Sequence, residues 1–85
     1  MNITEAKEFI STIDPKGLAL EARRSDAPYP VKWREHRQGG GVVIDDAEID
    51  YTNMTDKDII LFAKYRKISF DLWRMNYGKT LYEIF

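Results

Sequence analysis

The sequence predicts one α+β domain: two short helices, a β-hairpin, a long helix and a short C-terminal tail. Three observations predict it. Apolar residues near the N-terminus recur at helical spacing, two β-prone runs flank three glycines, and a long run without glycine or proline follows Thr55. A chain of 85 residues has the size of one domain, so we expect residues 1–85 to fold as a single unit.

Both short helices have recognisable N-terminal signals. We expect the first to begin at Thr4 as N-cap, with an apolar face at the i, i+3, i+4, i+7 spacing made of Ala6, Phe9, Ile10 and Ile13. Asp14 and Pro15 are typical of the N-cap and N1 positions of a second helix. Leu18 and Ala22 would then point inward from that helix.

The hairpin is predicted from alternation. Ser25–Pro30 contains two prolines and favours an extended connector. The run Val31–Gln38 alternates, with Val31, Trp33 and Glu35 on one side and Lys32, Arg34 and His36 on the other, and Gly39–Gly41 leads into Val42–Ile44. Two such runs around a glycine turn indicate a hairpin, with Ile49 and Tyr51 continuing its β character. A helix over residues 31–37 is the competing interpretation.

The long helix is predicted to run from Asp56 to Tyr77, after the N-cap Thr55 and before a C′ residue, Gly78. A short apolar tail, residues 79–85, follows it. One apolar face of this helix collects Ile59, Phe62, Ala63, Phe70, Trp73 and Tyr77. A second face collects Leu61, Tyr65, Ile68, Leu72 and Met75.

A surface helix normally has a single apolar stripe, so this helix needs cover on two sides. We expect the hairpin to cover one side. The N-terminal helices, a second copy of the chain or another protein would cover the other. The second face is therefore our predicted protein interface, in a homodimer or with a different partner.

Charge is distributed in blocks although the net charge is only −1. Residues 23–38 hold five basic and two acidic side chains, and residues 39–58 hold one basic and six acidic. Tyr29 and Trp33 lie within the basic block, and cations with aromatic residues are typical of nucleic-acid surfaces. The alternative hypothesis is therefore nucleic-acid binding through phosphate contacts from Arg23, Arg24, Lys32, Arg34, Arg37, Lys64, Lys67 and Arg74.

Most chemical motifs are excluded by residue type or spacing. One histidine and no cysteine leave too few ligands for zinc, and the acidic run of Asp45, Asp46, Glu48 and Asp50 lacks the spacing of an EF-hand. We expect that run to be solvated and to pair with the chain's own basic residues. Gly78-Lys79-Thr80 follows a predicted helix, so it is not a phosphate-binding loop. No metal, cofactor or small-molecule substrate is indicated.

His36 lies among Arg34, Glu35 and Arg37, which are the residue types of a metal-independent ribonuclease. No second motif supports that activity, so catalysis around His36 is the weakest of three hypotheses. The leading one is a small non-enzymatic interaction protein that occludes or bridges a macromolecular partner. Small size and the lack of a motif are typical of phage or mobile-element inhibitors of host factors. The missing cysteines and signal peptide favour the cytoplasm, and no apolar run is long enough to span a membrane.

Overall fold

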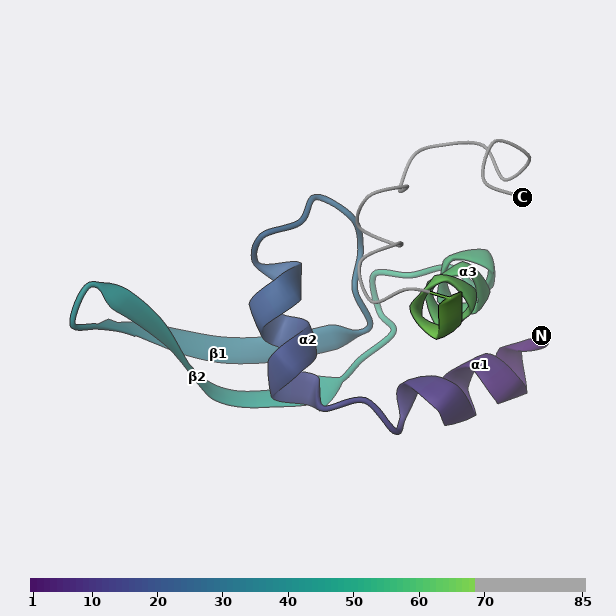
Figure 1. The fold of residues 1–85 in the computed structure, drawn as a ribbon, viewed down its shortest axis with the longest axis horizontal. Coiled ribbons are helices and arrows are strands. Elements are labelled where there is room, and N and C mark those ends of the chain that lie inside the picture. Colours follow the sequence, from purple (N-terminus) through teal and green to yellow (C-terminus); the bar gives the residue numbers. More distant parts are fainter. Residues whose placement is uncertain (69–85) are drawn as a thin grey trace.

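The computed structural model describes residues 1–68, which form a small α+β domain as predicted. The elements in chain order are α1 (Ile3–Ile10), α2 (Pro15–Ala22), β1 (Val31–Gln38), β2 (Gly41–Ile49) and α3 (Asp56–Ile68) (Figure 1). The predicted extension of the last helix to Tyr77 and the tail at 79–85 lie outside the described residues.

Side-chain caps fix the starts of the helices, and one predicted cap is wrong. Asn2, not Thr4, is the N-cap of α1: its side chain accepts a hydrogen bond from the Glu5 backbone N–H (2.8 Å), and the Glu5 carboxylate accepts one from the Asn2 N–H (3.1 Å). This reciprocal pair of hydrogen bonds satisfies two backbone N–H groups that have no carbonyl partner within the helix. Asp14 caps α2 as predicted. At the start of α3, the Thr55 hydroxyl accepts a hydrogen bond from the Asp58 backbone N–H at 3.2 Å.

Strands β1 and β2 form an antiparallel two-stranded hairpin, so the helical interpretation of residues 31–37 is wrong. Gln38 pairs with Gly41, which leaves Gly39 and Gly40 as a two-residue turn. Both have positive φ angles, 60° and 82°, which side-chain-bearing residues rarely adopt. The consecutive glycines are therefore what allows this tight turn to form.

A β-bulge interrupts β2. Arg34 pairs with Asp46 while its neighbour Glu35 pairs with Ile44, so Asp45 has no partner on β1. A bulge adds one residue to one strand and shifts the alternation of its side chains. As a result Ile44 and Ala47, three positions apart, are both partly buried, and Asp45 and Asp46 are both exposed.

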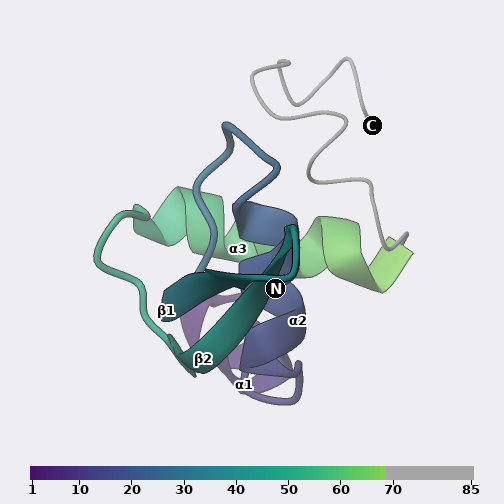
Figure 2. The ribbon, with the colours of Figure 1, turned by 90° about the vertical axis from the view of Figure 1, so that its left-hand side faces the viewer.

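The helices lie differently on the hairpin than we expected. Helix α2 packs across both strands, whereas α1 packs against α3 (Figures 1 and 2). The connector before β1 also reaches α3, because the Tyr29 ring meets the Phe62 ring edge-on with centroids 5.3 Å apart. In its described part, Asp56–Ile68, the last helix therefore packs mainly on α1 and not on the hairpin as expected. Helical periodicity identifies an apolar face but not the element that packs on it.

One core joins these layers. A buried ion pair links them as well: Arg66 of α3 donates to Glu21 of α2 at 2.6 Å, with the two side chains only 5% and 12% exposed. Within residues 1–68, no helix has the length and apolar character needed to cross a membrane. The buried apolar residues are Ala6, Ile10, Leu18, Ala19, Ala27, Tyr29, Val31, Met54, Ile59, Phe62, Ala63 and Tyr65.

Candidate interaction surface on the hairpin

The hairpin projects from the rest of the described chain. Its glycine turn lies at the end farthest from α1 and α3, and α2 crosses only one of its two faces (Figures 1 and 2). We call the face toward α2 the inner face and the opposite one the outer face. The outer face carries Lys32, Arg34 and His36 on β1 and Asp45, Asp46 and Glu48 on β2.

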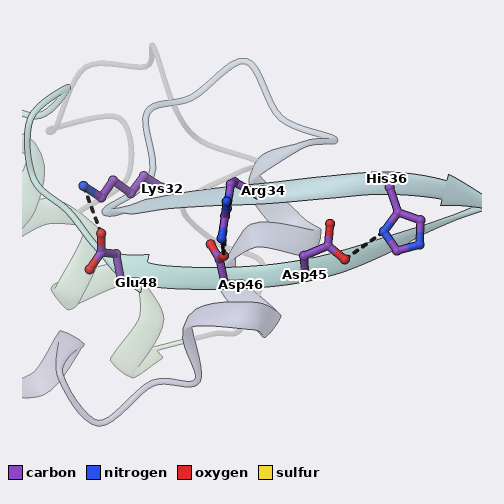
Figure 3. A network of polar contacts seen from close by, with 6 residues as sticks. All are labelled: Lys32, Arg34, His36, Asp45, Asp46 and Glu48. Carbon is purple, nitrogen blue, oxygen red and sulfur yellow. Dashed lines mark hydrogen bonds and ion pairs between the residues drawn. The ribbon is translucent and has the colours of Figure 1, made fainter.

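Basic and acidic side chains of the outer face form an ordered ladder between the strands (Figure 3). The members of the ladder are between 44% and 81% exposed, so water screens each pair. A shallow, open hollow lies over the body-side half of this ladder. The pairs are Lys32 Nζ with Glu48 Oε1 (2.9 Å), Arg34 Nε with Asp46 Oδ2 (2.8 Å) and His36 Nδ1 with Asp45 Oδ1 (2.7 Å).

The ladder favours the charged forms of Lys32 and Asp46. The hydrogen bond that Lys32 donates to Glu48 raises the pKa of Lys32, and the hydrogen bond that Asp46 accepts from Arg34 lowers the pKa of Asp46. Lys32 on β1 is therefore held cationic and Asp46 on β2 anionic.

The prediction that the acidic run is solvated and pairs with the chain's own basic residues is confirmed for Asp45, Asp46 and Glu48. Asp50 is instead half-buried and accepts a hydrogen bond from the Thr52 hydroxyl.

His36 contacts an oxygen atom with each ring nitrogen. Nδ1 lies 2.7 Å from Asp45 Oδ1, and Nε2 lies 3.3 Å from Gln38 Oε1. Hydrogen bonding to Gln38 and then to Asp45 raises the pKa of His36. Of the residues of the ribonuclease hypothesis, only Arg34 shares the outer face with His36, because alternation places Glu35 and Arg37 on the inner face.

The inner face holds its own charged cluster beside α2. Arg23, at the C-terminus of α2, donates to both carboxylate oxygens of Glu35 at 3.1 and 3.2 Å, and the indole of Trp33 donates to Glu35 at 2.7 Å. These bonds, first from Arg23 and then from Trp33, lower the pKa of Glu35. Trp33 is half-buried and packs against the core, so it supports the hairpin and is not an exposed stacking platform.

The predicted phosphate contacts are distributed over separate elements, and several are already engaged. Arg23, Lys32 and Arg34 are in ion pairs with carboxylates of the hairpin. Arg24 and Arg37 are exposed and form no ion pair with a described residue.

The helical cations lie on another part of the fold. Lys67 of α3 lies over the Phe9 ring of α1, 5.3 Å from its centroid, and Lys64 is half-buried on α3. Arg74 lies outside the described residues. The basic residues of the hairpin and of α3 thus have different surroundings.

The described residues of the predicted protein interface on the last helix differ in their exposure. Tyr65 is 2% exposed within the single chain and Leu61 is half-buried against the core, so packing by this chain already covers them. Tyr65 is therefore a core residue and not part of an open contact face. Ile68 is 64% exposed. Leu72 and Met75 lie outside the described residues.

Within residues 1–68, no three acidic or histidine side chains lie close enough together to hold a metal ion. No family model, no curated protein and no solved structure matches the chain. The proposals below therefore depend on the geometry of the described residues.

Proposed function

We propose that this chain is a small non-enzymatic interaction protein that occludes or bridges a protein partner, and that its hairpin makes the contact. The observation that carries the proposal is the projection of the hairpin beyond the helices, with its outer face covered by no other described element (Figures 1 and 2). An isolated hairpin is only marginally stable in water. Here the packing of α2 across both strands holds the hairpin in one shape, which lowers the entropic cost of binding.

A protein partner fits the charge arrangement better than nucleic acid does. A phosphate backbone is uniformly negative and needs an uninterrupted basic track. On the outer face, Lys32 and Arg34 instead lie directly beside Glu48 and Asp46, which would repel phosphate. Protein surfaces carry both signs of charge and can match two parallel rows of opposite sign.

Self-association through the last helix stays a prediction. Among the described members of that face, only Ile68 is strongly exposed, whereas Tyr65 is buried by its own chain. The outer face of the hairpin carries six exposed polar or charged side chains, and for that reason we assign the contact to it.

A charge-swapped hairpin tests the proposal. We expect Lys32→Glu with Glu48→Lys, combined with Arg34→Asp and Asp46→Arg, to keep each ion pair and the fold while reversing both rows. In affinity capture from the native cells, the wild-type chain should retain a partner that the swapped chain loses. The exposed Glu8→Lys on α1 is the matched control and should retain it. Equal capture by the swapped chain would contradict a role for the hairpin.

Nucleic-acid binding, the alternative, rests on the exposed Arg24 and Arg37 and has a separate test. If those cations bind phosphates, retention on duplex DNA should weaken with salt at a log–log slope of about −0.9 per phosphate neutralised. Replacing both arginines by Glu should then abolish it. We expect no retention even at low salt. Salt-sensitive binding that these substitutions remove would favour the alternative. RNA cleavage lost in His36→Ala would favour the ribonuclease hypothesis.

A further inference from the structure

We infer that the edge of β2 that faces away from β1, here called the outward edge, is a docking site for an extended segment of a partner protein. In that segment apolar and basic residues alternate. This inference rests on the proposed function and specifies the strand and the chemistry of its ligand.

The edge of β2 that faces away from β1 is paired with no other described strand. The sheet has two strands in the order β1-β2, so no other described strand takes the outward backbone groups of β2. An edge of this kind can accept a further strand through main-chain hydrogen bonds, while the flanking side chains provide specificity.

The side chains of β2 are segregated by face. Its inner row is entirely apolar and half-buried: Val42, Ile44, Ala47 and Ile49. Its outer row from Asp45 to Glu48 is acidic. Because side chains of neighbouring strands contact those directly opposite, an added strand would place its alternate residues against one row or the other. Apolar residues suit the inner row and Lys or Arg suits the outer row.

The ladder leaves acceptor oxygens for a second cation. Glu48 uses Oε1 for Lys32, and Asp46 uses Oδ2 for both hydrogen bonds from Arg34. Glu48 Oε2 and Asp46 Oδ1 have no hydrogen-bond partner among the described residues. An ionised carboxylate can accept several hydrogen bonds, so each acid can lie between a cation of β1 and a cation of a docked strand.

The chain itself displays the pattern that β2 selects. On its other side β2 pairs with residues 31–34, Val-Lys-Trp-Arg, in which apolar and basic residues alternate. The register places Lys32 opposite Glu48 and Trp33 opposite Ala47. A partner segment of the same alternation would repeat these contacts on the open side.

Charge repulsion also disfavours a second copy of the chain that docks through its own β2 edge. Two β2 edges paired with each other would bring two acidic rows together, and like charges on neighbouring strands destabilise a sheet. A second copy offering its β1 edge would match in charge. That contact is head-to-tail, so it would produce rings or open assemblies larger than a dimer that grow with concentration.

The bulge limits the docking site to the body-side part of β2. At Asp45 the regular pairing of β2 with β1 is interrupted, whereas residues 46–49 pair with β1 without a break. Asp46 and Glu48 face outward over this run, and Ala47 and Ile49 face inward. The docked segment is therefore short and centred opposite residues 46–49.

A designed peptide tests the inference. The probe is Thr-Val-Lys-Val-Arg-Val-Lys-Thr, and the control is the same peptide with Glu and Asp in place of its cations. In a ¹⁵N-labelled chain we expect the basic peptide to shift the amide signals of residues 46–49. The double change Asp46→Asn with Glu48→Gln should weaken the affinity for the basic peptide about tenfold, whereas Glu8→Gln on α1 should leave that affinity unchanged. N-methylation of alternate peptide bonds should abolish binding, because an edge contact requires backbone donors.

Three results would overturn the inference. One is equal binding of the acidic peptide, and another is amide shifts confined to other elements. The third is concentration-dependent growth of the chain alone in light scattering, because a second copy would then be the occupant. The charge-swapped capture experiment separates the two proposals. If the swapped chain loses its native partner but the peptide does not bind β2, the proposed function stands and the edge site falls.

Discussion

The two faces of the hairpin share the same two strands but have different roles. On the inner face Val31 is 6% exposed and α2 packs across both strands. On the outer face Lys32 and Arg34 lie in water with side chains 63% and 81% exposed. Burial on one face supplies stability, and a solvated ladder adds little to it. The residues of the outer face are therefore available for recognition without a large effect on folding.

The ion pairs show the same contrast. Glu21 and Arg66 are almost fully buried between α2 and α3, whereas Arg34 and Asp46 are mostly exposed. Removing one member of a buried pair leaves an uncompensated charge in a medium of low dielectric constant, but water replaces a lost partner at the surface. The predictions below use matched changes at the buried and the exposed sites.

The largest effect is expected for Glu21→Ala, which removes the nearly buried carboxylate that accepts a hydrogen bond from Arg66 at 2.6 Å. We expect the free energy of unfolding in urea to fall by about 3–5 kcal/mol. Glu48→Ala, which removes an exposed carboxylate of the ladder, is the control and should leave the midpoint nearly unchanged. A double change, Glu21→Leu with Arg66→Met, should recover most of the loss. Equal effects of the buried and exposed changes would contradict the contrast.

A somewhat smaller loss is expected for Leu18→Ala in α2. Leu18 is fully buried in the core that α2 forms with the hairpin, so its truncation leaves a cavity. We expect a destabilisation of about 2–5 kcal/mol by chemical denaturation. Val43→Ala truncates a 40% exposed side chain on the other side of the hairpin and should change stability by less than about 0.5 kcal/mol. A large effect at Val43 would mean that another surface covers the outer face in solution.

The turn gives a third test, because it sets the register of both faces. Gly40→Ala forces a side chain into a backbone conformation with φ near 82°, at a cost of about 1–2 kcal/mol. Gly41→Ala is the matched control: a Cβ there would lie 3.7 Å from the Gln38 carbonyl oxygen, an ordinary contact. Thermal unfolding of the two variants should therefore differ. Similar midpoints would argue against the two-residue glycine turn.

Much of the fold could be predicted because the decisive signals are local. The proline connector, the alternation in 31–38 and the glycines predict the hairpin, and the Asp14 and Thr55 caps are read directly from the sequence. The Asn2 cap was missed although Glu5 stands three residues later, the spacing of a capping box. The bulge was also missed.

A signal for the bulge is present in β2. Apolar residues alternate at Val42 and Ile44 and again at Ala47 and Ile49, but the two alternations are out of phase. A phase change within one strand indicates an inserted residue.

The packing partners could not be predicted, because helical periodicity does not identify what covers a face. Tyr65 belonged to a face assigned to another molecule, yet this chain buries it, and α1 packs on α3 where the hairpin was expected. The ladder was partly predictable from the basic and acidic blocks. Its pairing of Lys32 with Glu48 needed the register, which depends on the turn and on the bulge.

The smallest expected effect is a pH dependence at His36. Hydrogen bonds to Gln38 and Asp45 raise the pKa of His36 above its ordinary value of 6.5 in the folded chain. Protonation therefore favours folding. The stabilisation is fully present below about pH 6.5 and is lost as the pH rises through the raised pKa.

Two measurements check this dependence. An NMR titration of the imidazole should give a pKa above 6.5, and Gln38→Ala or Asp45→Asn should each lower it. Unfolding in urea should show a larger difference between wild type and His36→Ala in mildly acidic than in mildly alkaline buffer, with other titrating groups cancelling in that comparison. A pKa of His36 at or below 6.5 would mean that His36 does not form its hydrogen bonds with Asp45 and Gln38 in solution. The ladder would then end at Arg34.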